Sequence, residues 1–150
     1  MGLFPKSFYS NNLTKTEVRE AKKLAKLKDI KQDLNTGEFI LDQKGDFIIL
    51  EDLDALMQIN KKKLSTPRGK YIIYSKDFGS NVYVLNGQTK YIMEMHIEDF
   101  LIQSLVDNKY TLSITNIEIE REEQGYYTVS FLVSTVYGQY NENTQIEAIV

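Results

Sequence analysis

The chain has no cysteine and a single histidine. The absence of cysteine excludes disulfides and thiolate metal sites, so packing must stabilise the fold. The histidine, His96, lacks a second histidine or a cysteine that would complete a set of metal ligands. We therefore expect it to be an ordinary helix residue, and we expect neither a metal nor a cofactor.

The sequence also lacks a long apolar run and a strong excess of one charge. No stretch approaches the roughly 20 apolar residues of a membrane span, and the start MGLFPKSFYS has no signal-peptide core, so we expect synthesis in the cytoplasm and no membrane partner. A net charge of -3 provides no field that would hold a polyanion, so nucleic acid is not expected as a partner. A length of 150 residues is enough for one domain with a single core.

The N-terminal part is expected to lie outside that core. Residues 1–13 contain Pro5, and their aromatic and polar residues follow no regular period, which predicts an extended arm. Residues 14–35 are expected to form a peripheral lysine-rich helix and a linker, because Thr14 suits a helix cap and apolar residues follow at helical spacing as far as about Asp29. This apolar stripe consists of Val18, Ala21, Leu24 and Ala25. The surrounding lysines indicate a solvated face or a surface that docks on an acidic partner.

Residues 36–150 are expected to form the folded domain. Two apolar runs in EFILDQKGDFIIL flank a turn at Gly45, which predicts a hairpin. The next segment, EDLDALMQINKKKL, has acidic residues early, lysines late and apolar residues at helical spacing, which predicts a helix. Its run Lys61 to Lys63 fits either a helix end or a small nucleic-acid patch, and the helix end is the simpler interpretation.

The stretch LSTPRGKYIIYSKDFGS is interpreted as an architectural corner. Thr66 and Pro67 are expected to end the helix, residues 70–74 to form a strand, and Gly79 to reverse the chain so that the next strand can form. A second turn is expected at Asn86-Gly87. Residues 91–107 have apolar side chains at helical spacing and predict the clearest helix of the chain.

The last third of the chain has the pattern of β-strands. In YTLSITNIEIER the alternation of apolar and polar residues slips by one position, so an extra residue is needed if all apolar side chains face the core. This predicts a β-bulge near Thr115-Asn116. YYTVSFLVSTVY alternates, and its expected apolar face consists of Tyr127, Val129, Phe131, Val133 and Tyr137. The final strand, TQIEAIV, is expected at a sheet edge that offers unpaired backbone to a partner strand. We therefore expect an α+β fold, in which a mixed or antiparallel sheet with a long C-terminal hairpin packs against two or three helices.

The sequence contains no complete catalytic motif. Asp77-Phe78-Gly79 matches the metal-binding triplet of protein kinases, but the glycine-rich loop, the strand lysine and the catalytic-loop residues are missing. We interpret Gly79 as a turn glycine and Phe78 as an apolar plug between two strands. Acidic residues are numerous, yet none is singled out as one of the two carboxylates of a glycosidase. We therefore expect no enzymatic activity.

Three segments in a fixed order resemble a known family: FILDQKGDFIILEDLDALMQINKKKLSTPRGKYIIYSKDFGSNVYVLNG, HIEDFLIQSLVDN and VSFLVSTVYG. They are similar to the small baseplate wedge, or sheath-initiator, proteins of contractile phage tails, defective prophages and R-type bacteriocins, which are sometimes labelled lysozyme-like. The resemblance covers roughly residues 36–138. Its matching positions are Thr66 with Arg68, Tyr71 and Tyr74, Phe78-Gly79-Ser80, and Glu98 with Leu101 and Leu105. Where the family has a step with Pro and Arg after its long helix, this chain has Lys109, which cannot reproduce the bidentate fork of arginine.

The resemblance implies a structural baseplate component that joins the baseplate to the sheath and nucleates sheath assembly by strand addition. Its implied partners are the sheath protein, other baseplate wedge proteins and the tail tube, with six copies around the tube of a particle made in a bacterial host. The candidate interface residues are Thr66, Arg68, Lys109, Gln145, Ile146, Glu147 and Ala148, and the structural turn consists of Pro67, Phe78, Gly79 and Ser80. Arg68 is expected to bind a carboxylate, either on the wedge or within its own fold.

Two other functions stay open at this point. A tail-associated peptidoglycan glycosidase would fit the lysozyme-like label and requires clearing of peptidoglycan. A nucleic-acid-binding accessory protein would use the lysine-rich residues 14–35, and its binding would weaken steeply with added salt.

Overall fold

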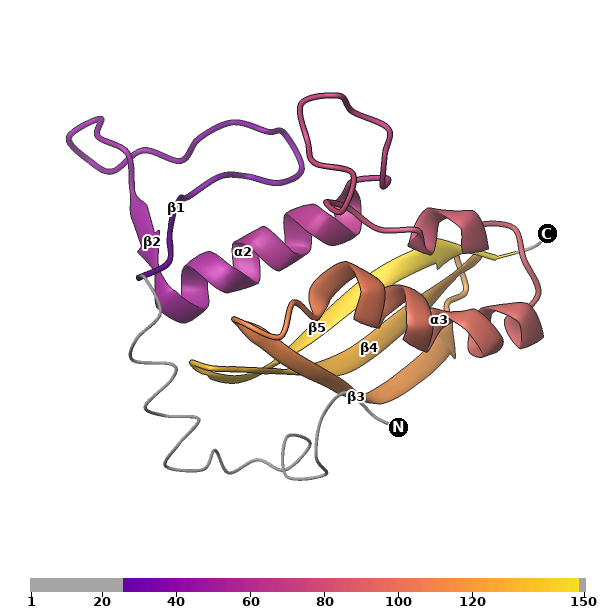
Figure 1. The fold of residues 1–150 in the computed structure, drawn as a ribbon. Helices are drawn as coiled ribbons and strands as arrows, with labels where there is room; N and C mark the ends of the chain where they lie inside the picture. The colour runs from indigo at the N-terminus through magenta and orange to yellow at the C-terminus, as the bar shows by residue number, and fades with distance from the viewer. Residues whose placement is uncertain (1–25, 149–150) are drawn as a thin grey trace.

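A computed structural model describes residues 26–148 of the chain (Figure 1). Its elements, in chain order, are β1 (Lys28–Ile30), β2 (Ile49–Glu51), α2 (Asp52–Ser65), the 3-10 helix η2 (Val82–Leu85), α3 (Lys90–Leu105), β3 (Thr111–Arg121), β4 (Tyr126–Thr135) and β5 (Gly138–Glu147). The combination of helices and antiparallel sheets confirms the expected α+β fold class. The extended arm predicted for residues 1–13 and most of the predicted lysine-rich helix lie outside the described residues.

The main sheet is antiparallel and has the order β3-β4-β5. Its central strand, β4, alternates as the sequence predicts, and its inward side chains are buried: Tyr127, Val129, Phe131 and Val133. Both helices cover this face, as Figure 1 shows for α3 over the sheet and α2 beside β5. One side of the sheet therefore builds the core while the other stays partly solvated, as is common for antiparallel sheets.

The predicted β-bulge in β3 is confirmed. The register of β3 against β4 shifts between Thr115 and Glu118, and Asn116 has a φ of 54°. Asparagine tolerates this left-handed conformation better than most residues. The extra residue lets the apolar side chains on both sides of the bulge face the core.

The predicted helices at residues 51–64 and 91–107 are confirmed as α2 and α3. The Thr89 hydroxyl caps α3 by accepting from the Ile92 amide, and the buried apolar side chains of α3 are Met93, Ile97, Leu101 and Leu105. His96 lies on the exposed side of α3 and stacks on Phe100, with 5.9 Å between the ring centroids. Its position is that of an ordinary helix residue.

A buried polar cluster joins α2 to the main sheet. The Asn60 side-chain amide donates to Tyr140 Oη at 2.9 Å and to Thr111 Oγ1 at 3.2 Å. Burial raises the pKa of Tyr140 to about 12, although the hydrogen bond from Asn60 partly opposes this shift. These bonds satisfy the buried Asn60 nitrogen, whereas Asn60 Oδ1 has no partner among residues 26–148, and they help to fix the position of α2 on the sheet.

Residues 28–51 form a separate lobe that packs on α2, and we call them the β1–β2 lobe. The strand β1 pairs with β2, and single bridges join Gln32 to Phe39 and Leu41 to Phe47. Gly45 has a φ of 86° in the turn between Leu41 and Phe47. The predicted turn is therefore confirmed, although only a single bridge pairs the residues on its two sides. The helix predicted to reach Asp29 is wrong beyond residue 25, because pairing with β2 holds residues 28–30 in an extended conformation.

Two further strand predictions are wrong. Residues 70–74 form turns and bends instead of a strand, and the side chains of Ile72 and Ile73 are 102% and 86% exposed because no neighbouring strand covers them. Tyr137 lies in the turn between β4 and β5 and not on the face of a strand. The last strand begins at Gly138, earlier than the sequence pattern suggests, because its N-terminal half has polar side chains.

Candidate protein interface

The corner after α2 is held by hydrogen bonds between its two ends. The Ser80 amide donates to Thr66 O at 2.8 Å, and the Arg68 amide donates to Ser80 O at 3.1 Å. Pro67 lies between these bonds in a parallel bridge with Ser80, and the Ser80 side chain is buried. The structure therefore brings the predicted turn residues together, and a loop of residues 68–79 projects from a fixed base.

Gly79 is required at this base. It has a φ of 104°, and a Cβ atom on it would lie 2.6 Å from Thr66 O and 3.0 Å from Arg68 Cα. Both neighbours are backbone atoms of the hydrogen-bonded corner, so neither can rotate away. Because Gly79 precedes the 3-10 helix η2, it reverses the chain into a helix and not into the strand that we expected.

Arg68 anchors the corner to the end of α3. One guanidinium nitrogen, Nη2, donates to Gln103 O at 2.6 Å, whereas the buried Nε atom has no hydrogen-bond partner among residues 26–148. A cation at the C-terminal end of a helix also interacts favourably with the helix dipole. The internal salt bridge that we considered for Arg68 is not formed within residues 26–148, because its partner there is a backbone carbonyl.

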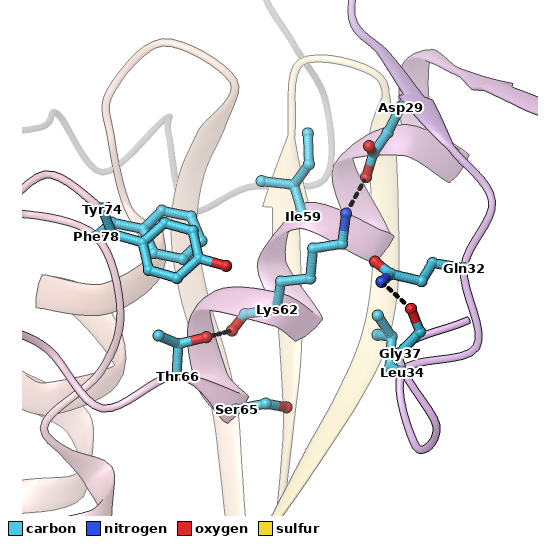
Figure 2. A pocket seen from close by; sticks show the side chains of 10 residues that line it. All are labelled: Asp29, Gln32, Leu34, Gly37, Ile59, Lys62, Ser65, Thr66, Tyr74 and Phe78. Atoms are coloured by element: carbon cyan, nitrogen blue, oxygen red, sulfur yellow. Dashed lines mark hydrogen bonds and ion pairs between the residues drawn. The ribbon is translucent and has the colours of Figure 1, made fainter. Parts of the chain in front are cut away.

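A cleft of about 430 Å³ separates this loop from the β1–β2 lobe. Figure 2 shows Tyr74 and Phe78 stacked on one wall, with a distance of 4.5 Å between ring centroids, and Lys62 reaching toward Asp29 on the other. Phe78 was expected between two strands. It packs instead on a tyrosine of its own loop, since the loop contains no strand.

Asp29 fixes the β1–β2 lobe to α2. Its carboxylate accepts from Lys62 Nζ at 2.9 Å and from Gln58 Nε2 at 2.7 Å. Burial favours the neutral form of Asp29, but the hydrogen bonds from Lys62 and Gln58 outweigh this effect and lower its pKa. The carboxylate is therefore ionised at neutral pH and is committed to an internal contact.

A second cleft, of about 400 Å³, lies between the loop of residues 68–79 and the end of α3. Lys63 and Asp107 line it. Burial lowers the pKa of the Lys63 ammonium, and the Asp107 carboxylate partly opposes that change. Asp107 also accepts from the amides of the next turn, including that of Lys109 at 2.9 Å, which leaves the Lys109 side chain exposed over the Tyr110 ring.

The outer edge of β5 is already partly occupied. Asn86 Oδ1 accepts from the Glu147 amide at 3.0 Å, and the Gly87 amide donates to Glu147 O at 2.9 Å. Lys61 Nζ donates to Asn143 O at 2.8 Å. The backbone groups of Asn143 and Glu147 that point away from β4 are therefore already bonded. The side chains of Ile146 and Ala148 are buried in the core.

Within residues 26–148, the outer edge of β3 has no partner over its C-terminal half. Pairing of Glu120 and Glu122 with β4 directs the backbone groups of Ile119 and Arg121 away from the sheet. No residue between 26 and 148 bonds to these outward groups. A groove of about 270 Å³, lined by Glu94, Ile97, Glu98, Ile117 and Ile119, runs between this strand and α3.

The candidate interface residues therefore fall into two separate groups. Thr66 and Arg68 belong to the corner after α2, which Arg68 anchors to the end of α3, and Lys109 follows the end of α3. In the second group, residues 145–148, Glu147 bonds to Asn86 and Gly87. The sequence interpretation missed the roles of Gln103 and Asn86 and the open β3 edge. The bulge at Asn116 was the available signal for that edge, because bulges are common on edge strands.

None of the helices formed by residues 26–148 combines the length and the apolar composition of a membrane span. The same part of the chain contains no group of three or more histidine and acidic side chains that could hold a metal ion.

Residues 26–148 form an α+β domain in which the outward backbone groups of Ile119 and Arg121 on β3 have no partner among these residues. The family model of the contractile injection system sheath initiator matches residues 28–138, and the chain belongs to this family. The resemblance inferred from the sequence is thus confirmed, and the match begins with β1. The protein has a structural role related to the sheath of a contractile injection system. No curated protein matches the chain.

Proposed function

We propose that the protein is a baseplate component that joins the baseplate to the sheath and nucleates sheath assembly by accepting a strand from a sheath subunit. Six copies surround the tail tube and contact other baseplate wedge proteins. The observation that supports this proposal is the outer edge of β3, whose C-terminal half pairs with none of the residues that the structure describes. Backbone pairing along such an edge gives a joint of fixed geometry without a large apolar patch.

The groove beside β3 supports the proposal by offering a place for side chains of the incoming strand. Ile97, Ile117 and Ile119 make part of its wall apolar, and Glu94 and Glu98 add negative charge at the rim. A strand with apolar side chains on one face and lysine or arginine nearby would complement this surface. Thr66, Arg68 and Lys109 do not line the groove, and we propose that they contact wedge proteins.

Electron microscopy of particles from a producer strain that lacks this gene tests the role directly. Naked tubes or isolated baseplates, with sheath protein left soluble or in stray polysheaths, are expected. Particles with normal sheaths would overturn the proposal.

Two proline variants decide which sheet edge accepts the strand. Arg121→Pro removes an outward amide from β3, and Gln145→Pro removes an outward amide from β5. Proline is tolerated where an edge N–H faces solvent, so both variants should fold. We expect Arg121→Pro to abolish sheath attachment to purified baseplates, and Arg121→Gln, which keeps the amide, to retain it.

Gln145→Pro should leave sheath attachment intact. If Gln145→Pro blocks attachment while Arg121→Pro does not, the joint lies at residues 145–148, as the sequence suggested. We further propose that the chain has no glycosidase activity. Clearing of peptidoglycan in a zymogram by the purified chain would contradict this.

A further inference from the structure

The β1–β2 lobe has an apolar face that nothing in the described part of the chain covers. Its residues are Phe39, Leu41, Phe47 and Ile49, with exposures of 50%, 50%, 55% and 52%. The rings of Phe39 and Phe47 contact each other edge to face, with 5.5 Å between centroids, and Leu41 bridges to Phe47. Leu41 and Ile49 lie two positions along the chain from Phe39 and Phe47, so we treat the four exposed side chains as one patch, and such patches usually mark an interaction site.

The opposite side of the lobe is already in contact with α2. The Gln58 side chain donates to Ile30 O at 2.8 Å and accepts from the Gln32 amide at 2.9 Å. Figure 1 shows the lobe at the end of the molecule, beyond α2 and away from β3. The apolar face therefore needs an occupant that is not the rest of the described fold.

The charge of the lobe indicates what this occupant is. Residues 28–51 contain six acidic side chains and three lysines, and four of the acids have no lysine or arginine nitrogen within 4.0 Å in the described part of the chain. These four are Asp33, Glu38, Asp42 and Asp46. An occupant with an apolar stripe between basic side chains would complement both the face and its surroundings.

Residues 1–25 of the same chain have this chemistry. They contain five basic and two acidic side chains, so their net charge is opposite in sign and equal in size to that of the lobe. The stripe of Val18, Ala21, Leu24 and Ala25 follows helical spacing, and a helix of residues 14–25 would be about 18 Å long. The next residue, Lys26, already forms an ion pair with Glu51 at the base of the lobe, at 2.8 Å.

We infer that residues 14–25 dock on the apolar face of the β1–β2 lobe, with the stripe against Phe39 and Phe47 and the basic side chains toward the acidic residues of the lobe. The connection to β1 is only a few residues long, which gives the segment a high effective concentration at this face. The acidic partner considered for the lysine-rich segment is then the chain itself. This inference does not depend on the sheath-related role.

Paramagnetic relaxation enhancement in the full chain tests the inference. The chain has no cysteine, so Thr16→Cys provides one site for a nitroxide label, and by helical spacing Thr16 lies opposite the stripe. We expect the label to broaden the backbone amide signals of residues 39–49 and to leave those of Ile72 and Ile73 sharp. Unaffected lobe signals, or equal broadening of both regions, would overturn the inference.

Variants on both sides of the contact supply the controls. Phe47→Glu and Leu24→Glu should each remove the broadening, and Ile72→Glu, which adds the same charge at an exposed apolar residue outside the lobe, should preserve it. A mixture of spin-labelled chains with isotope-labelled chains that carry no spin label detects contact between two copies. Broadening in that mixture as strong as in the single chain would assign the face to a dimer and overturn the inference. Protection of the lobe amides only in assembled particles would assign it to another particle protein, with the same consequence.

Discussion

Substitution of Gly79 by alanine is expected to destabilise the corner after α2. The backbone at Gly79 has a φ of 104°, which costs a residue with a side chain about 1–3 kcal/mol. The added Cβ would also lie 2.6 Å from Thr66 O, which accepts from the Ser80 amide. Moving that oxygen weakens a backbone hydrogen bond worth roughly 1 kcal/mol. Together these effects predict a loss of about 2–4 kcal/mol in the free energy of unfolding.

Gly69→Ala is the matched control in the same loop. Gly69 also has a left-handed backbone, with a φ of 76°, but a Cβ atom there meets nothing within 4 Å. It should cost only the backbone strain, about 1–2 kcal/mol. The difference between the two variants therefore isolates the contact with the corner.

Urea unfolding followed by circular dichroism measures both variants. We expect an unchanged denaturant slope and a lower midpoint for each, with the larger change for Gly79→Ala. In a thermal scan, the loss for Gly79→Ala corresponds to a decrease of roughly 5–15 °C in Tm for a chain of this size. Equal losses for the two variants would show that Thr66 O does not constrain residue 79, and the account of the corner would be wrong.

Two further predictions concern pH. The pKa of Asp29 is lower in the folded chain, so its contribution to the free energy of unfolding is present above its ordinary pKa and is lost as pH falls. The difference in this free energy between the wild type and Asp29→Asn should therefore shrink from about pH 5 to pH 2. A difference in urea midpoints that stays constant over this range would contradict the prediction. The pKa of Tyr140 is raised to about 12 in the folded chain. The contribution of this side chain to the free energy of unfolding is therefore complete below its ordinary pKa near 10 and is lost as pH rises toward 12. Tyr140→Phe should be less sensitive to alkaline unfolding than the wild type, as followed by tyrosinate absorbance and circular dichroism, and equal sensitivity would remove Tyr140 as the cause.

The elements that were predicted correctly carry their signal in local sequence. The apolar spacing of α3, the charge order of α2, Gly45 in its turn and the phase change at Asn116 each need only neighbouring residues to be recognised. Residues 70–74 have the composition of a strand, but a strand also needs a partner, and the fold provides none there. Strand β1 was missed for the opposite reason, because pairing with β2 overrides the helical spacing of the preceding segment.

The site was less predictable than the fold. The sequence indicated that Arg68 has an important role after a helix end, but its partner is the Gln103 carbonyl, and a backbone atom leaves no sequence signal. A terminal strand was expected to offer an open edge, and β5 does lie at an edge of the sheet. The contacts of Asn86 and Gly87 with Glu147 join residues about 60 positions apart, and only the tertiary structure reveals them.

The last turns of α2 contact three parts of the molecule: the main sheet, the β1–β2 lobe and the corner. Lys61 binds Glu142 on β5, Lys62 binds Asp29 on β1, and the Thr66 hydroxyl returns to Lys62 O at the start of the corner. Two residues of a lysine run that resembles a simple solvated helix end therefore join α2 to two different sheets. Because β2 also continues directly into α2, a displacement of the main sheet would be transmitted to the β1–β2 lobe through this one helix.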